Sequence, residues 1–216
     1  MSVNGLKNKE FDQKKDRIDL PIFLIHGIGA SSITLWPLEK YLNYKGFKNT
    51  FKIDYPVNKM TFLDSVNYVD AEISKLADKE KDKIILIGQS MGGVISNELH
   101  KKGWKIEKAI YVVAPLNGAD LLNKLIRRLP ERFTNFMHIP PYDHLMKGEK
   151  AIEPPHAYHT IGVSWPFMDF DGCVYKEEAI LDEKKHSHLR WLDHRTAFVS
   201  IRLWMEVYNK LLHDIA

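Results

Sequence analysis

The chain has 216 residues, of which 44% are hydrophobic and 27% charged, and its formal net charge at pH 7 is +3. This length suits one domain with a sizeable core, and the composition is ordinary for a soluble globular protein. The charge is too small to indicate a nucleic-acid partner, no apolar run has membrane-spanning length, and a single cysteine, Cys173, excludes an internal disulfide.

The first nineteen residues are polar and charged, and they contain no apolar stretch of the kind found in signal peptides. We expect residues 1–19 to form a flexible arm ahead of a single domain at 20–216. The absence of a signal peptide favours a cytoplasmic location, with which the single cysteine is consistent.

Short apolar runs rich in β-branched residues alternate with amphipathic segments along the chain. The runs predict six strands, at residues 20–25, 47–54, 83–87, 108–114, 157–163 and 186–192. Helices are predicted between most of them and after the last, beginning at or near Pro37, Thr61, Val94, Leu121 and Thr196. This alternation indicates an α/β fold with a parallel, doubly wound sheet, in which ligands bind at the carboxyl ends of the strands.

The first predicted strand runs directly into a glycine-containing loop, His26-Gly27-Ile28-Gly29. Such a loop can present bare backbone N–H groups to an anion, because little side chain shields them. The loop is therefore a candidate for one half of an oxyanion hole. His26 itself is predicted to be structural rather than catalytic.

The sequence Gly88-Gln89-Ser90-Met91-Gly92 stands between a predicted buried strand and a predicted helix. This is the pattern of a nucleophile elbow, a sharp turn in which the glycines avoid collisions and the serine hydroxyl is lifted clear of the sheet. The first N–H groups of the helix then face whatever Ser90 attacks. A serine hydroxyl is a poor nucleophile at neutral pH, so it needs a base and a group that orients the base.

Candidates for both groups come late in the chain. Asp171 follows the fifth predicted strand in an Asp-Gly turn, where an orienting carboxylate would sit, although a plain turn is the alternative, and Asp169 stands just before it. His194 lies at a strand-to-helix junction on the same carboxyl-end face. His186 and His188 alternate along the sixth strand, but no cysteine or carboxylate at ligand spacing joins them, so a surface strand is favoured over a metal site.

Residues 117–156 interrupt the alternation of strands and helices with an amphipathic helix and an apolar stretch without clear periodicity. An insertion at this point would lie over the mouth of the site. It is predicted either as a cap or lid that lines an acyl pocket or as an ordinary connecting helix with a packed loop.

Together these motifs resemble the α/β-hydrolase superfamily, and within it the small bacterial lipases and lipase-like esterases. Three motifs carry the resemblance: the H-G-x-G loop at 26–29, the G-x-S-x-G elbow at 88–92, and the D-G-x-V turn at 171–174 followed by His194. The order Ser, Asp, His is the order that this superfamily uses. The resemblance implies a minimal α/β-hydrolase fold, with about six mostly parallel strands flanked by helices and a small cap.

The resemblance also implies a role for each residue. Ser90 is the nucleophile, His194 the general base and Asp171 the acid that orients the imidazole, with Asp169 as the alternative acid. The backbone N–H groups of Ile28 and Met91 would bind the oxyanion. No metal and no organic cofactor is implied.

The predicted function is hydrolysis of a small-molecule or lipid carboxylic ester through an acyl-enzyme. Acyl transfer and thioester hydrolysis use the same three residues and stay open as alternatives. Peptidase activity is less favoured, because no peptide-binding domain is appended. A non-catalytic binding protein on a hydrolase fold is the alternative from another class, since a fold alone does not guarantee activity.

Overall fold

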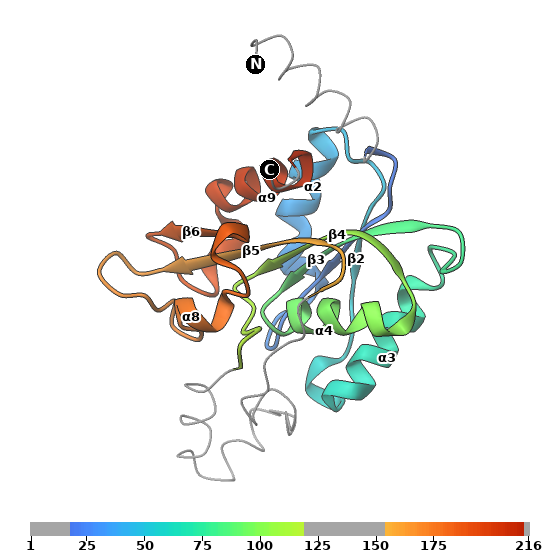
Figure 1. The fold of residues 1–216 in the computed structure, drawn as a ribbon, viewed down its shortest axis with the longest axis horizontal. Helices are drawn as coiled ribbons and strands as arrows, with labels where there is room; N and C mark the ends of the chain where they lie inside the picture. The colour runs from blue at the N-terminus through green and yellow to red at the C-terminus, as the bar shows by residue number, and fades with distance from the viewer. Residues whose placement is uncertain (1–17, 119–153, 214–216) are drawn as a thin grey trace.

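A single parallel sheet lies at the centre of the computed structural model, which describes residues 18–118 and 154–213 (Figure 1). Its strands are β1 (Ile22–Ile25), β2 (Thr50–Ile53), β3 (Lys83–Gln89), β4 (Lys105–Val112), β5 (Ala157–Ser164) and β6 (His186–Arg190). Neighbouring strands pair in parallel, in the order β2-β1-β3-β4-β5-β6. The predicted six strands and the doubly wound α/β class are confirmed.

Strand β1 is apolar along its whole length because helices cover both faces of the sheet. All four residues of β1 are fully buried. Successive side chains point to opposite faces, so Phe23 and Ile25 join the core on one side while Ile22 and Leu24 join the core on the other. This explains why the first strand reads as an unbroken apolar run.

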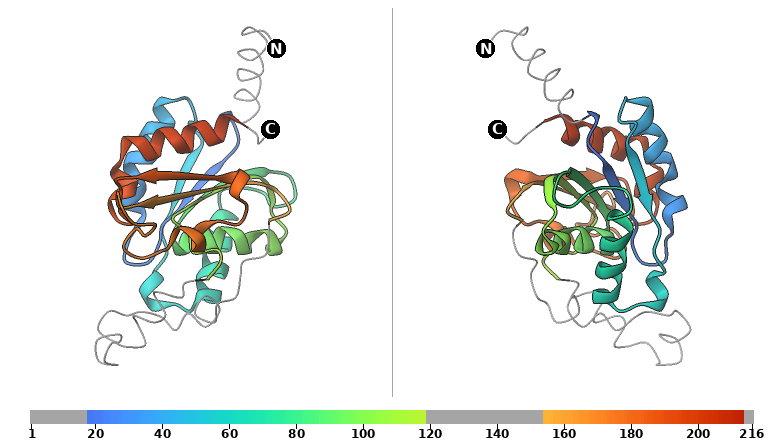
Figure 2. Two further views of the ribbon diagram at one scale, coloured as in Figure 1. Left: turned by 60° about the vertical axis from the view of Figure 1, so that its left-hand side comes forward. Right: turned by 90° about the vertical axis from the view of Figure 1, so that its right-hand side faces the viewer.

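Helices α2 (Trp36–Tyr44) and α9 (Ile201–Leu212) pack on one face of the sheet, and α3 (Phe62–Ile73) and α4 (Met91–Leu99) pack on the other (Figure 2). The shorter helical segments are η1 (Ser32–Leu35), η2 (Val57–Lys59), η3 (His100–Lys102), α8 (Lys176–Ala179), η4 (Glu183–Lys185) and η5 (Thr196–Val199). Thr61 caps α3 as predicted, because its hydroxyl oxygen accepts the N–H of Asp64 at 3.2 Å.

Two helix boundaries differ from the prediction. The helix after the elbow begins at Met91 rather than Val94, because the low helix propensity of the two glycines before Val94 obscures its start in the sequence. The last predicted helix, 196–212, is divided into η5 and α9 by Ser200, whose backbone is extended.

Two predicted segments fall largely outside the described ranges. They are the N-terminal arm at 1–19 and the cap at 117–156, so both stay predictions. Within residues 18–118 and 154–213, no helix has the length and apolarity needed to cross a membrane.

Candidate active site

Ser90 stands at a strained turn between the end of β3 and the start of α4. Its backbone has φ 50° and ψ −122°, a conformation that residues with side chains rarely adopt. Glycines on both sides make the turn sterically feasible. A Cβ at Gly88 would lie 2.4 Å from the Gly92 carbonyl oxygen, and a Cβ at Gly92 would lie 2.2 Å from the Ile25 carbonyl oxygen. These are the collisions that an elbow sequence avoids by using glycine.

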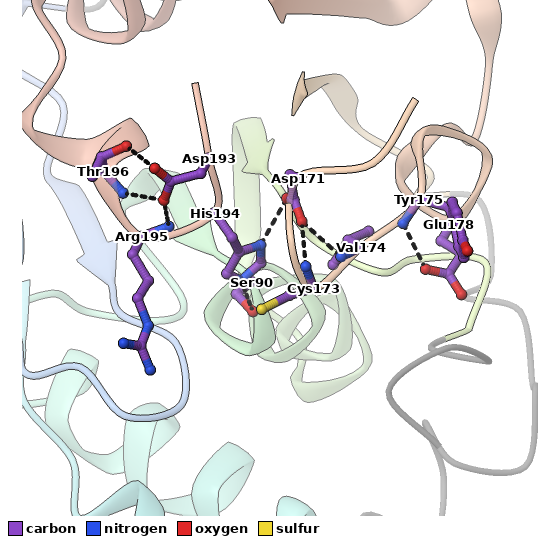
Figure 3. Close-up of polar contacts among 10 residues, drawn as sticks. All are labelled: Ser90, Asp171, Cys173, Val174, Tyr175, Glu178, Asp193, His194, Arg195 and Thr196. Carbon is purple, nitrogen blue, oxygen red and sulfur yellow. Dashed lines mark hydrogen bonds and ion pairs between the residues drawn. The ribbon is translucent and has the colours of Figure 1, made fainter. Parts of the chain in front are cut away.

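Three side chains from separate segments meet at the carboxyl edge of the sheet (Figure 3). His194 Nε2 lies 3.0 Å from Ser90 Oγ, and His194 Nδ1 lies 2.8 Å from Asp171 Oδ2. The Asp171 side chain is almost completely buried, with 2% of its surface exposed, and the His194 side chain is 13% exposed. The imidazole therefore bridges the hydroxyl and the carboxylate. This geometry allows it to accept the hydroxyl proton while the carboxylate holds its tautomer.

The Asp171 carboxylate is fixed from its other side by backbone donors. The N–H groups of Cys173 and Val174 donate to Oδ1 at 2.8 and 2.7 Å (Figure 3). Gly172 makes this tight turn with a φ of 103° that other residues rarely adopt. The backbone N–H of His194 donates to the Asp171 carbonyl at 2.9 Å. The acid and the base are thus joined through main chain as well as side chain.

Asp169, the alternative acid, lies in different surroundings. Its carboxylate is 3.8 Å from the Arg190 guanidinium, and about half of its side chain is exposed. The described contacts therefore favour Asp171 as the partner of His194.

Ile28 and Met91, the two predicted oxyanion-hole residues, flank Ser90 from the loop after β1 and from the start of α4. Met91 is the first residue of α4, directly after the serine. The loop after β1 lies against the serine from the other side, because a Cβ at Gly27 would come within 2.8 Å of Ser90 Cβ. The side chain of Ile28 packs against the apolar core. The part that the two N–H groups play stays a prediction.

His26 makes contacts that are structural. It is fully buried, and its ring stacks on that of Tyr55 with centroids 4.4 Å apart. Tyr55 donates its hydroxyl to the His26 carbonyl at 2.7 Å. Burial lowers the pKa of His26, although the Gly27 carbonyl and the Asp54 carboxylate act in the opposite direction. These contacts tie the loop after β1 to the chain after β2.

His186 and His188 lie on the edge strand β6, where both are partly buried against β5. His186 Nδ1 is 2.7 Å from Thr160 Oγ1, and His188 Nε2 is 2.9 Å from Ser164 Oγ. In the part of the chain that the structure describes, no three histidine, cysteine or carboxylate side chains are grouped so as to hold a metal ion.

Sequence patterns gave no sign of the contacts that shape the loop carrying His194. The N–H groups of Trp191 and Leu192 donate to the Ser164 carbonyl at 2.9 and 3.3 Å. Trp191 has a φ of 69°, which turns the chain at the end of β6. Asp193 accepts the N–H groups of Arg195 and Thr196 at 2.9 and 3.0 Å. An Asp followed by Thr three residues later is a weak turn signal, and no residue pattern predicts a tryptophan with positive φ.

Comparisons with known proteins give matches among solved structures only. No protein-family model matches the chain, and a search of curated proteins finds no match. A lipase of Bacillus licheniformis in its mature form is similar with a TM-score of 0.65 and 17% sequence identity, over 91% of this chain and 93% of that one.

Two further structures are similar over most of the chain. A lipase-esterase related protein from Clostridium acetobutylicum has a TM-score of 0.56 and 15% identity, over 88% of this chain and 93% of that one. Tomato methylketone synthase I, complexed with 2-tridecanone, has a TM-score of 0.58 and 13% identity, over 88% and 97%. At such identities the likeness establishes the fold alone. With its six parallel strands, the chain has a minimal α/β-hydrolase fold.

Proposed function

We propose that the protein is a serine carboxylic-ester hydrolase of the esterase or lipase type, with Ser90 as its nucleophile. One observation carries the proposal: Ser90 Oγ, the His194 ring and the Asp171 carboxylate form a continuous chain of contacts at 3.0 and 2.8 Å. The chain of contacts stands at the carboxyl edge of a parallel sheet, where α/β proteins bind their ligands.

The first half of the proposed reaction forms an acyl-enzyme. His194 Nε2 takes the hydroxyl proton as Ser90 Oγ attacks the ester carbonyl carbon, and Asp171 stabilises the imidazolium that results. The carbonyl oxygen becomes an oxyanion, for which the N–H groups of Ile28 and Met91 are the proposed donors. When the tetrahedral intermediate collapses, the ester C–O bond breaks, and His194 gives its proton to the departing alcohol.

The second half releases the acid. His194 takes a proton from water, whose oxygen attacks the acyl carbonyl carbon of the Ser90 ester. Collapse of this intermediate breaks the bond to Ser90 Oγ, which recovers its proton from His194. Acyl transfer differs only in that an alcohol replaces water, and thioester hydrolysis only in that a thiol leaves. Both therefore stay alternatives, as does a hydrolase-fold protein without catalytic activity.

Hydrolysis of p-nitrophenyl esters from acetyl to palmitoyl tests the proposal. We expect Ser90→Ala to lose at least about a thousandfold in kcat, because no other group replaces the nucleophile. Ser74→Ala is the matched control, since Ser74 is exposed at the end of α3. Equal rates in wild type and Ser90→Ala would overturn the assignment. Product analysis with added methanol separates hydrolysis from acyl transfer, because transfer yields the methyl ester.

The proposal includes a cytoplasmic location, with which the single cysteine of the chain is consistent. Cell fractionation with an antibody against the intact protein tests it directly, and recovery of the protein outside the cell would contradict it.

A further inference from the structure

Large apolar side chains gather on the surface at the carboxyl ends of β5 and β6. We call this group the apolar turn patch; its members and their exposed fractions are Trp165 (47%), Phe167 (92%), Met168 (53%) and Trp191 (69%). The rings of Phe167 and Trp191 contact each other edge to face, with centroids 6.4 Å apart. Single exposed apolar residues are normal on a soluble protein, whereas a contiguous group of large ones marks an interaction surface.

The turn that carries three of these residues is held in shape by hydrogen bonds. The N–H of Trp165 donates to the Phe170 carbonyl at 3.2 Å, which closes the turn. Arg190, at the end of β6, donates through Nη1 to the Pro166 carbonyl at 2.9 Å. The apolar side chains are therefore exposed on an ordered turn that is fastened to the neighbouring strand.

Trp191 is presented to solvent at a cost in backbone energy. Its φ of 69° is rare for a residue with a large side chain and is energetically unfavourable. The same residue donates its N–H to the Ser164 carbonyl at 2.9 Å, so the strained conformation is enforced by the fold. An enforced and strained tryptophan that points into water indicates a use for that orientation.

The position of the patch relates it to the candidate active site. All strands are parallel, so the ends of β5 and β6 lie on the same edge of the sheet as Ser90. The segment between β5 and α8 projects beyond the sheet at the left of Figure 1. Any molecule or surface that covered the apolar turn patch would therefore lie against the edge of the sheet that carries the candidate active site.

The charges around the patch favour an anionic occupant. Arg190 and Arg202 are joined at the edge of the patch, because Arg202 Nη1 donates to the Arg190 carbonyl at 2.8 Å. Asp169 supplies one opposing carboxylate, 3.8 Å from the Arg190 guanidinium. Of the charged side chains bonded to this turn and to the end of β6, two are arginines and one is an aspartate, so cationic groups outnumber anionic ones among these contacts. Anionic lipid headgroups attract such basic groups when they lie near a membrane surface.

We propose that the apolar turn patch is a peripheral membrane-binding surface that docks on an anionic phospholipid bilayer. Aromatic side chains with adjacent arginines are suited to the interface, where the rings enter the headgroup region and the guanidinium groups meet phosphate. A projecting turn fits a soft lipid surface, whereas a protein partner would need a hollow of matching shape. Docking in this way would bring the edge of the sheet that carries the candidate active site close to the bilayer.

Co-sedimentation of the full chain with lipid vesicles tests the proposal. The vesicles contain phosphatidylcholine alone or phosphatidylcholine with phosphatidylglycerol. The test variant is the double substitution Phe167→Ser and Met168→Ser, which changes two exposed side chains that lie outside the proposed catalytic machinery. The matched control is Tyr44→Ser, which removes an 83% exposed aromatic side chain at the end of α2.

We expect wild type and Tyr44→Ser to bind the anionic vesicles, and to bind them more tightly than the neutral ones. The double variant should bind at least about tenfold more weakly, because each apolar side chain of this size contributes roughly that factor when it leaves water. Ser90→Ala should bind vesicles like wild type, so a failure of the proposed catalysis would leave this result unchanged. Far-UV circular dichroism and the urea-unfolding midpoint of the double variant serve as the check that it is folded.

Three results would overturn the proposal. Wild type could remain in the supernatant with anionic vesicles, or the double variant could bind them as tightly as wild type. In the third, sedimentation velocity without lipid shows that wild type self-associates and that the double variant is a monomer, while neither protein binds vesicles. In that case the patch would be an interface between two copies of the chain.

Discussion

Ser90 and His194 are 104 residues apart in the chain and 3.0 Å apart in the structure. Ser90 could be singled out from the sequence because it sits in a local motif, and Asp171 because it stands in a recognisable turn. The donors that hold the Asp171 carboxylate could not, because they are the backbone N–H groups of Cys173 and Val174. Their direction depends on the shape of the turn and leaves no mark in the residue types.

Replacing Asp171 with asparagine should lower kcat for p-nitrophenyl butyrate by about 1000- to 10,000-fold. An amide in place of the carboxylate no longer holds the imidazole in the tautomer whose Nε2 accepts the serine proton. Asp169→Asn is the matched control, and we expect its kcat to stay within about threefold of wild type, since exposed ion pairs contribute little. A larger loss of kcat in the Asp169 variant than in the Asp171 variant would show that Asp169, and not Asp171, is the acid.

The elements were predictable where a single physical pattern governs a segment, and less so at their ends. Buried parallel strands such as β1 are predictable as apolar runs, and the structure contains all six predicted strands. The start of α4 was misplaced because close packing at the elbow demands glycine where a helix would otherwise avoid it. The boundary between η5 and α9 depends on how these segments pack on the sheet, which residue propensities do not encode.

Alanine at Gly92 should disrupt the elbow between β3 and α4. Its Cβ would lie 2.2 Å from the Ile25 carbonyl oxygen, and backbone atoms there cannot move aside. We expect a loss of at least about 3 kcal/mol in the free energy of unfolding. Gly103→Ala is the control, because a Cβ there meets nothing within 4 Å and only its φ of 86° is unfavourable, a cost of about 1 kcal/mol. Urea unfolding measures both, and equal losses would contradict the steric explanation.

His186, on the edge strand β6, should lower the free energy of unfolding at acid pH. Burial, assisted by the charges of His188, Lys176 and Lys210, lowers the pKa of His186 to about 4. Between pH 6.5 and 4 the unfolded chain therefore binds a proton at this position that the folded chain does not bind. The free energy of unfolding consequently falls as the pH is lowered through this window, by about 2 kcal/mol for this residue when its partial exposure is considered.

His186→Gln separates this effect from the other histidines. Glutamine can still bond the Thr160 hydroxyl but does not titrate, so the variant should lose less stability than wild type between pH 6.5 and 4. His213→Gln, at an exposed site after α9, is the control and should keep the wild-type pH dependence. If the free energy of unfolding fell equally with pH in wild type and in His186→Gln, His186 would not contribute to the pH dependence of stability.

At the scale of the whole molecule, the parallel class of the sheet was predictable but the strand order β2-β1-β3-β4-β5-β6 was not read from the residues. Alternating strands and helices imply parallel pairing, whereas the order depends on contacts between segments far apart in the chain. Lys108 makes such a contact. It is fully buried in β4, and its Nζ donates to the carbonyls of Lys210 and His213 at 2.8 and 2.6 Å.

Lys108→Met should weaken the attachment of the C-terminal helix to the sheet. Methionine fills the same space but leaves the two carbonyl oxygens at the end of α9 without this donor, at a cost of about 1–3 kcal/mol in the free energy of unfolding. Lys48→Met, at an exposed position, is the matched control and should change stability by no more than about 0.5 kcal/mol. Limited proteolysis should cut the Lys108 variant first within α9, because the carbonyls that lose the donor lie at the end of that helix. A first cleavage elsewhere, or unchanged stability, would mean that apolar packing of Leu203 and Val207 alone holds the helix in place.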